Sequence, residues 1–174
     1  AAISMALGCS IVGPVDPKEV LRLTERLFEA GVDMVAIADT VGYAGPKQVS
    51  DLVAAAVKIA GEKPDCIHLH DTRGMGIANA YAGLEMGVNT FDAAVAGLGG
   101  CPFAGHAGAA GNVCTEDLVF MCDEMGIETG INLEALMESA RLAEEIVGHP
   151  LPGSVMRGGS LRALREQVAA ARAA

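Results

Sequence analysis

Two histidines separated by one residue, His68 and His70, are the clearest indication of chemistry in this chain. In a β-strand, residues i and i+2 project from the same face, so both imidazoles would point into one space. Ile67 and Leu69 would then face the opposite way. Two imidazoles at the end of a strand can hold a divalent metal ion. The alternative is a pair of hydrogen-bonded histidines at a strand terminus.

A third polar residue, Asn112, follows a run rich in glycine and alanine and precedes an expected helix. Its amide oxygen is a hard, neutral donor. Two imidazoles and one oxygen suit Mg²⁺, Mn²⁺ or Zn²⁺. The cysteine and histidine spacings exclude a zinc finger, and the lack of thiolate ligands argues against structural zinc.

Cys101 lies between glycines and a proline in the segment 97–102. Glycine permits close backbone approach and hinge motion, so a cysteine here is placed for proton transfer or nucleophilic attack. The remaining cysteines are interpreted as small buried residues; they are Cys9, Cys66, Cys114 and Cys122. An odd number of cysteines without regular spacing predicts no disulfide framework and favours a reducing compartment.

Asp39 begins the motif Asp-Thr-Val-Gly, and Asp71 begins the similar Asp-Thr-Arg-Gly. Asp39 is a candidate acid/base or substrate-holding group. The alternative is a turn residue that hydrogen-bonds its own backbone, a role that suits Asp71 better. His106 and His149 lie in loop contexts and are interpreted as solvated or structural. The late arginines are interpreted as a solvated helix face; they are Arg162, Arg165 and Arg172.

The hydrophobic pattern predicts strands that alternate with helices. Asp16 before Pro17, with Glu19 two residues later, predicts the start of the first helix. Strands are expected at 3–7, 34–38, 66–70 and 90–94, with helices between them and a glycine-rich loop at 95–111. Further helices are expected at 116–124, 133–147 and 161–172.

This order predicts an α/β fold, the C-terminal half of a TIM (β/α)8 barrel with additional C-terminal helices. Residues 1–147 would form a partial barrel domain of about four β/α units plus helices, and 148–174 a tail with helical character. Barrel enzymes carry their chemistry at the C-terminal ends of the strands, where the candidate residues fall. A doubly wound open sheet is the rival fold, but no G-x-G-x-x-G follows the first strand.

The composition excludes several classes of protein. The net charge of −10 argues against nucleic-acid binding. Hydrophobic residues make up 51% of the chain, yet no apolar run approaches the roughly 20 residues of a membrane span. The chain opens directly on a strand pattern, so we expect a cut N-terminus, with any targeting segment upstream.

Three stretches carry a family resemblance: 68–72, 96–102, and 111–119 with its Gly-Asn and Thr-Glu-Asp-Leu-Val. Together they resemble the 3-hydroxy-3-methylglutaryl-CoA lyase family of the DRE-TIM metallolyase superfamily, from residue 3 to about residue 147. The cysteine loop is specific to this family. The His-x-His-Asp-Thr motif is shared with isopropylmalate and homocitrate synthases.

The resemblance implies a (β/α)8 barrel that uses Mg²⁺ or Mn²⁺ to cleave 3-hydroxy-3-methylglutaryl-CoA to acetyl-CoA and acetoacetate, in leucine degradation and ketone body metabolism. It assigns His68, His70 and Asn112 as metal ligands. It assigns Cys101 and His68 to proton transfer, and Asp39 as a catalytic-site acid. The expected partner is an acyl-CoA thioester, not nucleic acid or membrane. Assembly of the protein into a homo-oligomer is compatible with the resemblance. The expected compartment is the cytoplasm, or the mitochondrion in a eukaryote.

Two departures from the family pattern widen the range of interpretations. The family's amino-terminal strands, which supply an essential Arg and a metal-binding Asp, are absent, so this polypeptide alone should be inactive and poorly folded. The segment 102–111 is slightly longer than usual, which makes citramalyl-CoA or another 3-hydroxyacyl-CoA an alternative substrate. The chain is also compatible with a Claisen-condensing synthase and with a metal-binding barrel fragment that has no catalysis.

Overall fold

The computed structural model describes residues 1–101 and 110–173. The chain divides into two compact units. The first unit comprises Ala1–Ala93 with Gly99–Val113, and the second comprises Ala94–Leu98 with Cys114–Ala174. None of the helices in the described part of the chain has the length and apolar character needed to cross a membrane.

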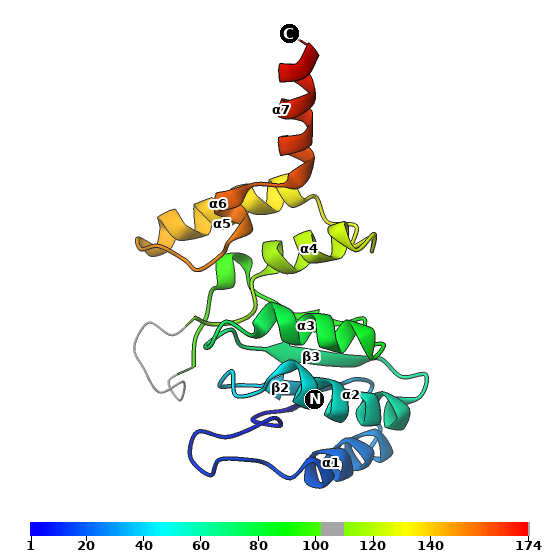
Figure 1. Ribbon diagram of the computed structural model, residues 1–174. Helices are drawn as coiled ribbons and strands as arrows, with labels where there is room; N and C mark the ends of the chain where they lie inside the picture. Colours follow the sequence, from blue (N-terminus) through cyan, green and yellow to red (C-terminus); the bar gives the residue numbers. More distant parts are fainter. Residues whose placement is uncertain (102–109, 174) are drawn as a thin grey trace. The chain divides into compact units, whose positions relative to one another are not determined.

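The first unit is built on a four-stranded parallel sheet with the strands in chain order (Figure 1). The strands are β1 (Ala2–Ile3), β2 (Val35–Asp39), β3 (Asp65–Leu69) and β4 (Phe91–Asp92), and the helices between them are α1 (Pro17–Glu29), α2 (Pro46–Ala60) and α3 (Gly76–Glu85). Each helix packs against the next. Parallel neighbours joined by single helices are the β/α repeat that the sequence predicted.

The strand register sorts the side chains into two faces. Ala38 of β2 pairs with His68 of β3, which in turn pairs with Asp92 of β4, so these three residues share one face. One residue earlier, Ile67 of β3 pairs with Phe91 of β4, and both side chains face α3. A Cβ added at Gly83 of α3 would lie within 4 Å of both side chains. The histidines therefore lie opposite the helix-covered apolar face, as predicted.

Helix starts are better predicted than the short strands. The Asp16 carboxylate accepts the backbone N–H of Lys18 at 2.9 Å and caps α1, as predicted. The strand expected at 3–7 ends at Ile3, so that prediction is wrong beyond this residue. Met5 adopts φ +56° and donates its N–H to Thr40 Oγ1 at 2.8 Å instead of to a strand.

The second unit is helical in its described residues. It contains a 3₁₀ turn, η1 (Val95–Gly97), followed by α4 (Thr115–Glu124), α5 (Leu133–Val147), α6 (Val155–Gly158) and α7 (Leu161–Ala173). One of its cores is formed by Ala96, Ala140, Leu151 and Met156, and another by Val119, Leu133, Met137 and Val155. The tail expected from residue 148 thus carries two helices; the domain division expected after residue 147 stays a prediction.

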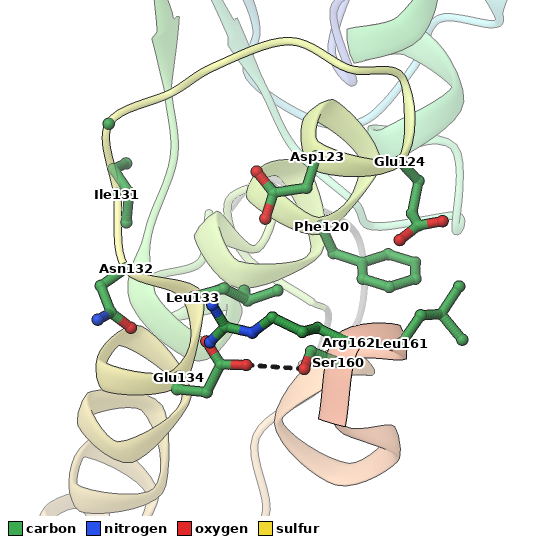
Figure 2. A pocket seen from close by; sticks show the side chains of 11 residues that line it. Phe120, Asp123, Glu124, Ile131, Asn132, Leu133, Glu134, Ser160, Leu161 and Arg162 are labelled. Carbon is green, nitrogen blue, oxygen red and sulfur yellow. Dashed lines mark hydrogen bonds and ion pairs between the residues drawn. The ribbon is translucent and has the colours of Figure 1, made fainter. Parts of the chain in front are cut away.

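Two ion pairs link the start of α7 to α5 and α4. Arg162 Nη2 lies 2.5 Å from Glu134 Oε2, and Arg165 Nη2 lies 3.0 Å from Glu124 Oε2. Ser160 donates its hydroxyl to Glu134 at 2.8 Å. Glu124, Ser160 and Arg162 border a cavity of about 480 Å³ that Phe120 and the segment 130–134 also line (Figure 2). Both arginines are largely exposed, as the sequence indicated, but each is also paired.

Candidate metal and catalytic site

The two histidines face each other at the C-terminal end of β3. Their Nε2 atoms lie 3.1 Å apart, with ring centroids separated by 5.1 Å and planes inclined by 52°. At this distance two neutral imidazoles can share one proton, or both can direct their lone pairs at one cation. The shared orientation predicted for His68 and His70 is therefore confirmed.

His70 is held in the form that can bind a metal. The residue is 6% exposed, and its Nδ1 has no hydrogen-bond partner among the described residues. Burial lowers the pKa of His70, and the neighbouring His68 lowers it further, whereas the charge of Asp39 acts in the opposite direction. The neutral imidazole, which carries the lone pair that a cation needs, is favoured.

Asn112 lies beside this pair although it is distant in sequence. Its backbone forms an antiparallel bridge with His70, and the N–H of Val113 donates to the carbonyl of Leu69 at 2.9 Å. Gly99 has φ +99°, and a Cβ there would lie 2.6 Å from Asn112 Nδ2, so any other residue would be strained and would displace the Asn112 side chain. The structure thus brings the three predicted ligand residues together.

The Asp39 carboxylate is fully buried and turned to its own loop. One oxygen accepts the N–H of Tyr43 at 2.7 Å, and the other accepts the N–H of Ala44 at 3.0 Å. Burial raises the pKa of Asp39, and the two amide bonds oppose that shift. The turn role is present in this structure, and the catalytic role stays a prediction.

The two Asp-Thr-x-Gly motifs form the same turn. Gly42 donates its N–H to the carbonyl of Asp39, and Gly74 donates to the carbonyl of Asp71, at 3.2 and 2.9 Å. In each motif the carboxylate also accepts an N–H five residues further on, which for Asp71 belongs to Gly76. The internal echo seen in the sequence is therefore a repeated structural unit.

Cys101 is more exposed to solvent than the other four cysteines. Cys101 is half-buried, whereas the remaining four are buried, as predicted: Cys9, Cys66, Cys114 and Cys122. Burial, followed by the charge of Asp92, raises the pKa of the Cys66 thiol to about 11.

His106 lies outside the described residues. His149 is exposed, with Nδ1 3.1 Å from the carbonyl of Pro150.

Asp92 is a neighbour of the histidine pair that sequence reasoning missed. Its Oδ2 lies 3.4 Å from His68 Nδ1, the ring nitrogen that points away from His70. The only signal was an acidic residue within the expected strand at 90–94. Its proximity to His68 depends on the β3–β4 register, which the sequence does not state.

No group of three or more histidine, cysteine, aspartate or glutamate side chains in the described ranges is placed to hold a metal. Among the described residues, the predicted donors for a cation are therefore the His68–His70 pair and Asn112, whose backbone bridges to His70. This donor set fits Mg²⁺ or Mn²⁺ when further oxygen ligands complete it.

Residues 1–143 match the family described as HMGL-like. The chain belongs to the HMGL-like family. One relative in that family, the hydroxymethylglutaryl-CoA lyase YngG of Bacillus subtilis, is 41% identical over 87% of this chain and 50% of its own length. The (R)-citramalyl-CoA lyase of Chloroflexus aurantiacus is 39% identical over 91% of this chain and 49% of its own length.

The fold of this chain is similar to that of solved HMG-CoA lyase structures. An HMG-CoA lyase from Acinetobacter baumannii, solved with coenzyme A and 3-methylmalate, gives a TM-score of 0.85 at 41% identity, over 91% of this chain and 52% of the lyase. The Bacillus subtilis HMG-CoA lyase also gives 0.85, at 39% identity. These structures are TIM barrels, so the predicted partial barrel is confirmed. The chain spans about half the length of the relatives it matches.

Proposed function

We propose that this chain is part of a metal-dependent lyase that cleaves 3-hydroxy-3-methylglutaryl-CoA to acetyl-CoA and acetoacetate. The observation that carries the proposal is the facing pair of histidine Nε2 atoms, 3.1 Å apart, at the C-terminal end of a barrel strand. The similarity to hydroxymethylglutaryl-CoA lyases supports it, at 41% identity for the Bacillus subtilis relative. The activity proposed is that of the whole protein.

We assign His68 and His70, through Nε2, and Asn112, through its amide oxygen, as the ligands that this chain gives to Mg²⁺ or Mn²⁺. The burial that keeps His70 neutral favours this role. When bound, the ion supplies a Lewis acid that acidifies the substrate's tertiary hydroxyl and orients the substrate.

The chain's own residues assist proton movement in a retro-Claisen cleavage. The proton of the tertiary hydroxyl passes to solvent as the bond between C2 and C3 breaks, and the hydroxyl carbon becomes the ketone of acetoacetate. His68 assists this proton transfer by holding, through Nε2, the ion that would acidify the hydroxyl. The electron pair of the broken bond passes to the acetyl-CoA enolate. Cys101 donates its thiol proton to the enolate carbon, which completes acetyl-CoA. Asp39, whose pKa burial raises, is the proposed acid of the site.

A related acyl-CoA is the second candidate substrate. The (R)-citramalyl-CoA lyase relative is nearly as similar as the hydroxymethylglutaryl-CoA lyases, at 39% identity. Both substrates carry a hydroxyl at C3 and release acetyl-CoA by the same bond cleavage. The difference lies in one substituent at C3, a carboxymethyl group in 3-hydroxy-3-methylglutaryl-CoA and a carboxylate in citramalyl-CoA.

A substrate panel with the full-length protein tests the proposal. Acetyl-CoA release would be measured from 3-hydroxy-3-methylglutaryl-CoA and from citramalyl-CoA, and condensation would be measured with acetyl-CoA and a 2-oxo acid. The proposal expects the highest kcat/KM for 3-hydroxy-3-methylglutaryl-CoA and no condensation. Preferred cleavage of citramalyl-CoA would establish the alternative lyase, and condensation would identify a synthase.

A further inference from the structure

Asp92 is the charged neighbour of the outer nitrogen of His68. In the sheet, Asp92 of β4 pairs directly with His68 of β3, and its Oδ2 lies 3.4 Å from His68 Nδ1. On the β2 side, the residue in the same row is Ala38, whose methyl group offers no hydrogen bond. The strand pairing therefore fixes a carboxylate on one flank of the His68 ring.

The two nitrogens of His68 face different groups. Nε2 faces His70 Nε2 at 3.1 Å, whereas Nδ1 faces the Asp92 carboxylate. A neutral imidazole carries its single proton on one nitrogen, and a carboxylate close to one of the two nitrogens favours the proton on that nitrogen. A proton on Nδ1 leaves the lone pair of Nε2 directed at the position between the histidines.

We propose that Asp92 is a positioning residue that holds His68 in its Nδ1–H tautomer and turns its Nε2 lone pair toward the metal position beside His70. The inference rests on the proposed metal site and extends it to a fourth residue. A carboxylate behind a histidine ligand fixes the ring orientation and raises the basicity of the ligand nitrogen.

A surface ion pair without a role is the competing account, because the Asp92 side chain is 58% exposed. Exposed ion pairs contribute little to folding, so loss of such a pair would leave the site unchanged. The chain offers a matched control: Lys47 and Asp51 form an exposed ion pair at 2.9 Å on α2. Asp51→Asn removes a surface carboxylate of the same kind from outside the site.

The test uses the full-length protein and Mn²⁺ alone as the probe. Isothermal titration calorimetry would compare wild type with Asp92→Asn, Asp92→Glu and Asp51→Asn. We expect Asp92→Asn to weaken Mn²⁺ binding by about 10–100-fold, the usual effect of losing a carboxylate behind a histidine ligand. Asp92→Glu should restore part of the affinity, and Asp51→Asn should bind as wild type. Unchanged affinity in Asp92→Asn would overturn the proposal.

A second measurement does not depend on any variant folding. In ¹⁵N-histidine-labelled wild type without metal, long-range ¹H–¹⁵N spectra report the tautomer of each ring. We expect His68 to carry its proton on Nδ1, and a proton on Nε2 would contradict the inference. Both readouts are independent of turnover. Mn²⁺ binding that depends on Asp92, without acyl-CoA cleavage, would reject the proposed reaction and keep the assignment of Asp92. Cleavage by the wild type, with unchanged Mn²⁺ affinity in Asp92→Asn, would keep the proposed reaction and reject the assignment of Asp92.

Discussion

Cys101 differs from the remaining four cysteines in its exposure, and this difference gives a direct test of its role. It is half-buried, while the rest are buried. In the full-length protein, Cys101→Ser should lower kcat by about 10²–10⁴-fold, because a hydroxyl is a weaker proton donor than a thiol. Mn²⁺ affinity should stay at the wild-type value. Cys122→Ala, on α4, is the control and should keep full turnover.

An unchanged kcat in Cys101→Ser would remove this thiol from the proposed proton transfer. A loss of Mn²⁺ affinity in the same variant would instead indicate a general disturbance of the site, since Cys101 is not a proposed ligand. Titration calorimetry beside steady-state kinetics separates the two results.

The sequence predicted the geometry of the histidine pair because a strand has a fixed period of two. His68 and His70 had to share a face once their segment was recognised as a strand. The same logic could not find Asp92, whose contact with His68 depends on how β4 aligns with β3. Nor could it choose between the two roles for Asp39, because the choice depends on a loop conformation that brings two amides to one carboxylate.

Two glycines at contrasting positions test how the β/α units pack. At Gly83 of α3, an added Cβ would lie 3.5 Å from Phe91 and 3.8 Å from Ile67, which are ordinary contacts. Gly83→Ala should therefore raise the free energy of unfolding by about 0.5–1 kcal/mol, the gain in helix propensity. Gly42 has φ +57°, and a Cβ there would lie 2.8 Å from Thr72 Cβ. Gly42→Ala should lower the free energy of unfolding by about 1–3 kcal/mol.

Urea unfolding of both variants in the full-length protein measures these effects. A destabilised Gly83→Ala variant would show that α3 lies closer to β3 and β4 than the structure places it. A Gly42→Ala variant as stable as wild type would show that the first Asp-Thr-x-Gly turn does not hold the left-handed conformation.

The attachment of α7 to α5 should depend on pH. The Ser160 hydroxyl, and then Arg162, lower the pKa of Glu134 below the usual value of a glutamate. A carboxyl with a lowered pKa stabilises the folded state above its unfolded pKa, and this contribution is lost as pH falls through the folded pKa. Ser160→Ala should therefore destabilise the protein more at about pH 7 than at about pH 4.

The hydroxyl of Ser160 also accepts the N–H of Ala163 at 3.2 Å, and loss of that bond adds a cost that does not vary with pH. Ser139→Ala is a suitable control, because the Ser139 hydroxyl donates within α5 to the carbonyl of Ala135. Urea unfolding at the two pH values checks the prediction. If Ser160→Ala lowered the free energy of unfolding equally at both pH values, its hydrogen bond to Glu134 would not contribute to stability.

Elements with strong local signals were predicted well, and elements fixed by distant contacts were not. Asp16 and Pro17 determine the start of α1 through a cap and a preset φ, which are properties of adjacent residues. The first strand ends early because Met5 bonds to Thr40, a residue on another β/α unit. An apolar run cannot show such a tertiary contact.

The sheet itself has two edges in the described residues, β1 and β4. Edge strands present unpaired N–H and C=O groups that pair with other chains. A polypeptide of these 174 residues expressed alone should therefore associate and show no lyase turnover. Size-exclusion chromatography with light scattering, beside an acetyl-CoA assay, checks this. A monomer with measurable turnover would contradict the expectation.

We propose that a metal held by the histidine pair supports cleavage of a 3-hydroxyacyl-CoA. The most direct test incubates the full-length protein with 3-hydroxy-3-methylglutaryl-CoA and follows both products. We predict that acetyl-CoA and acetoacetate form in equal amounts with Mg²⁺ or Mn²⁺, and that a chelator stops the reaction until the metal is restored. Equal product formation at an undiminished rate after complete metal removal, or no cleavage with metal present, would contradict the account.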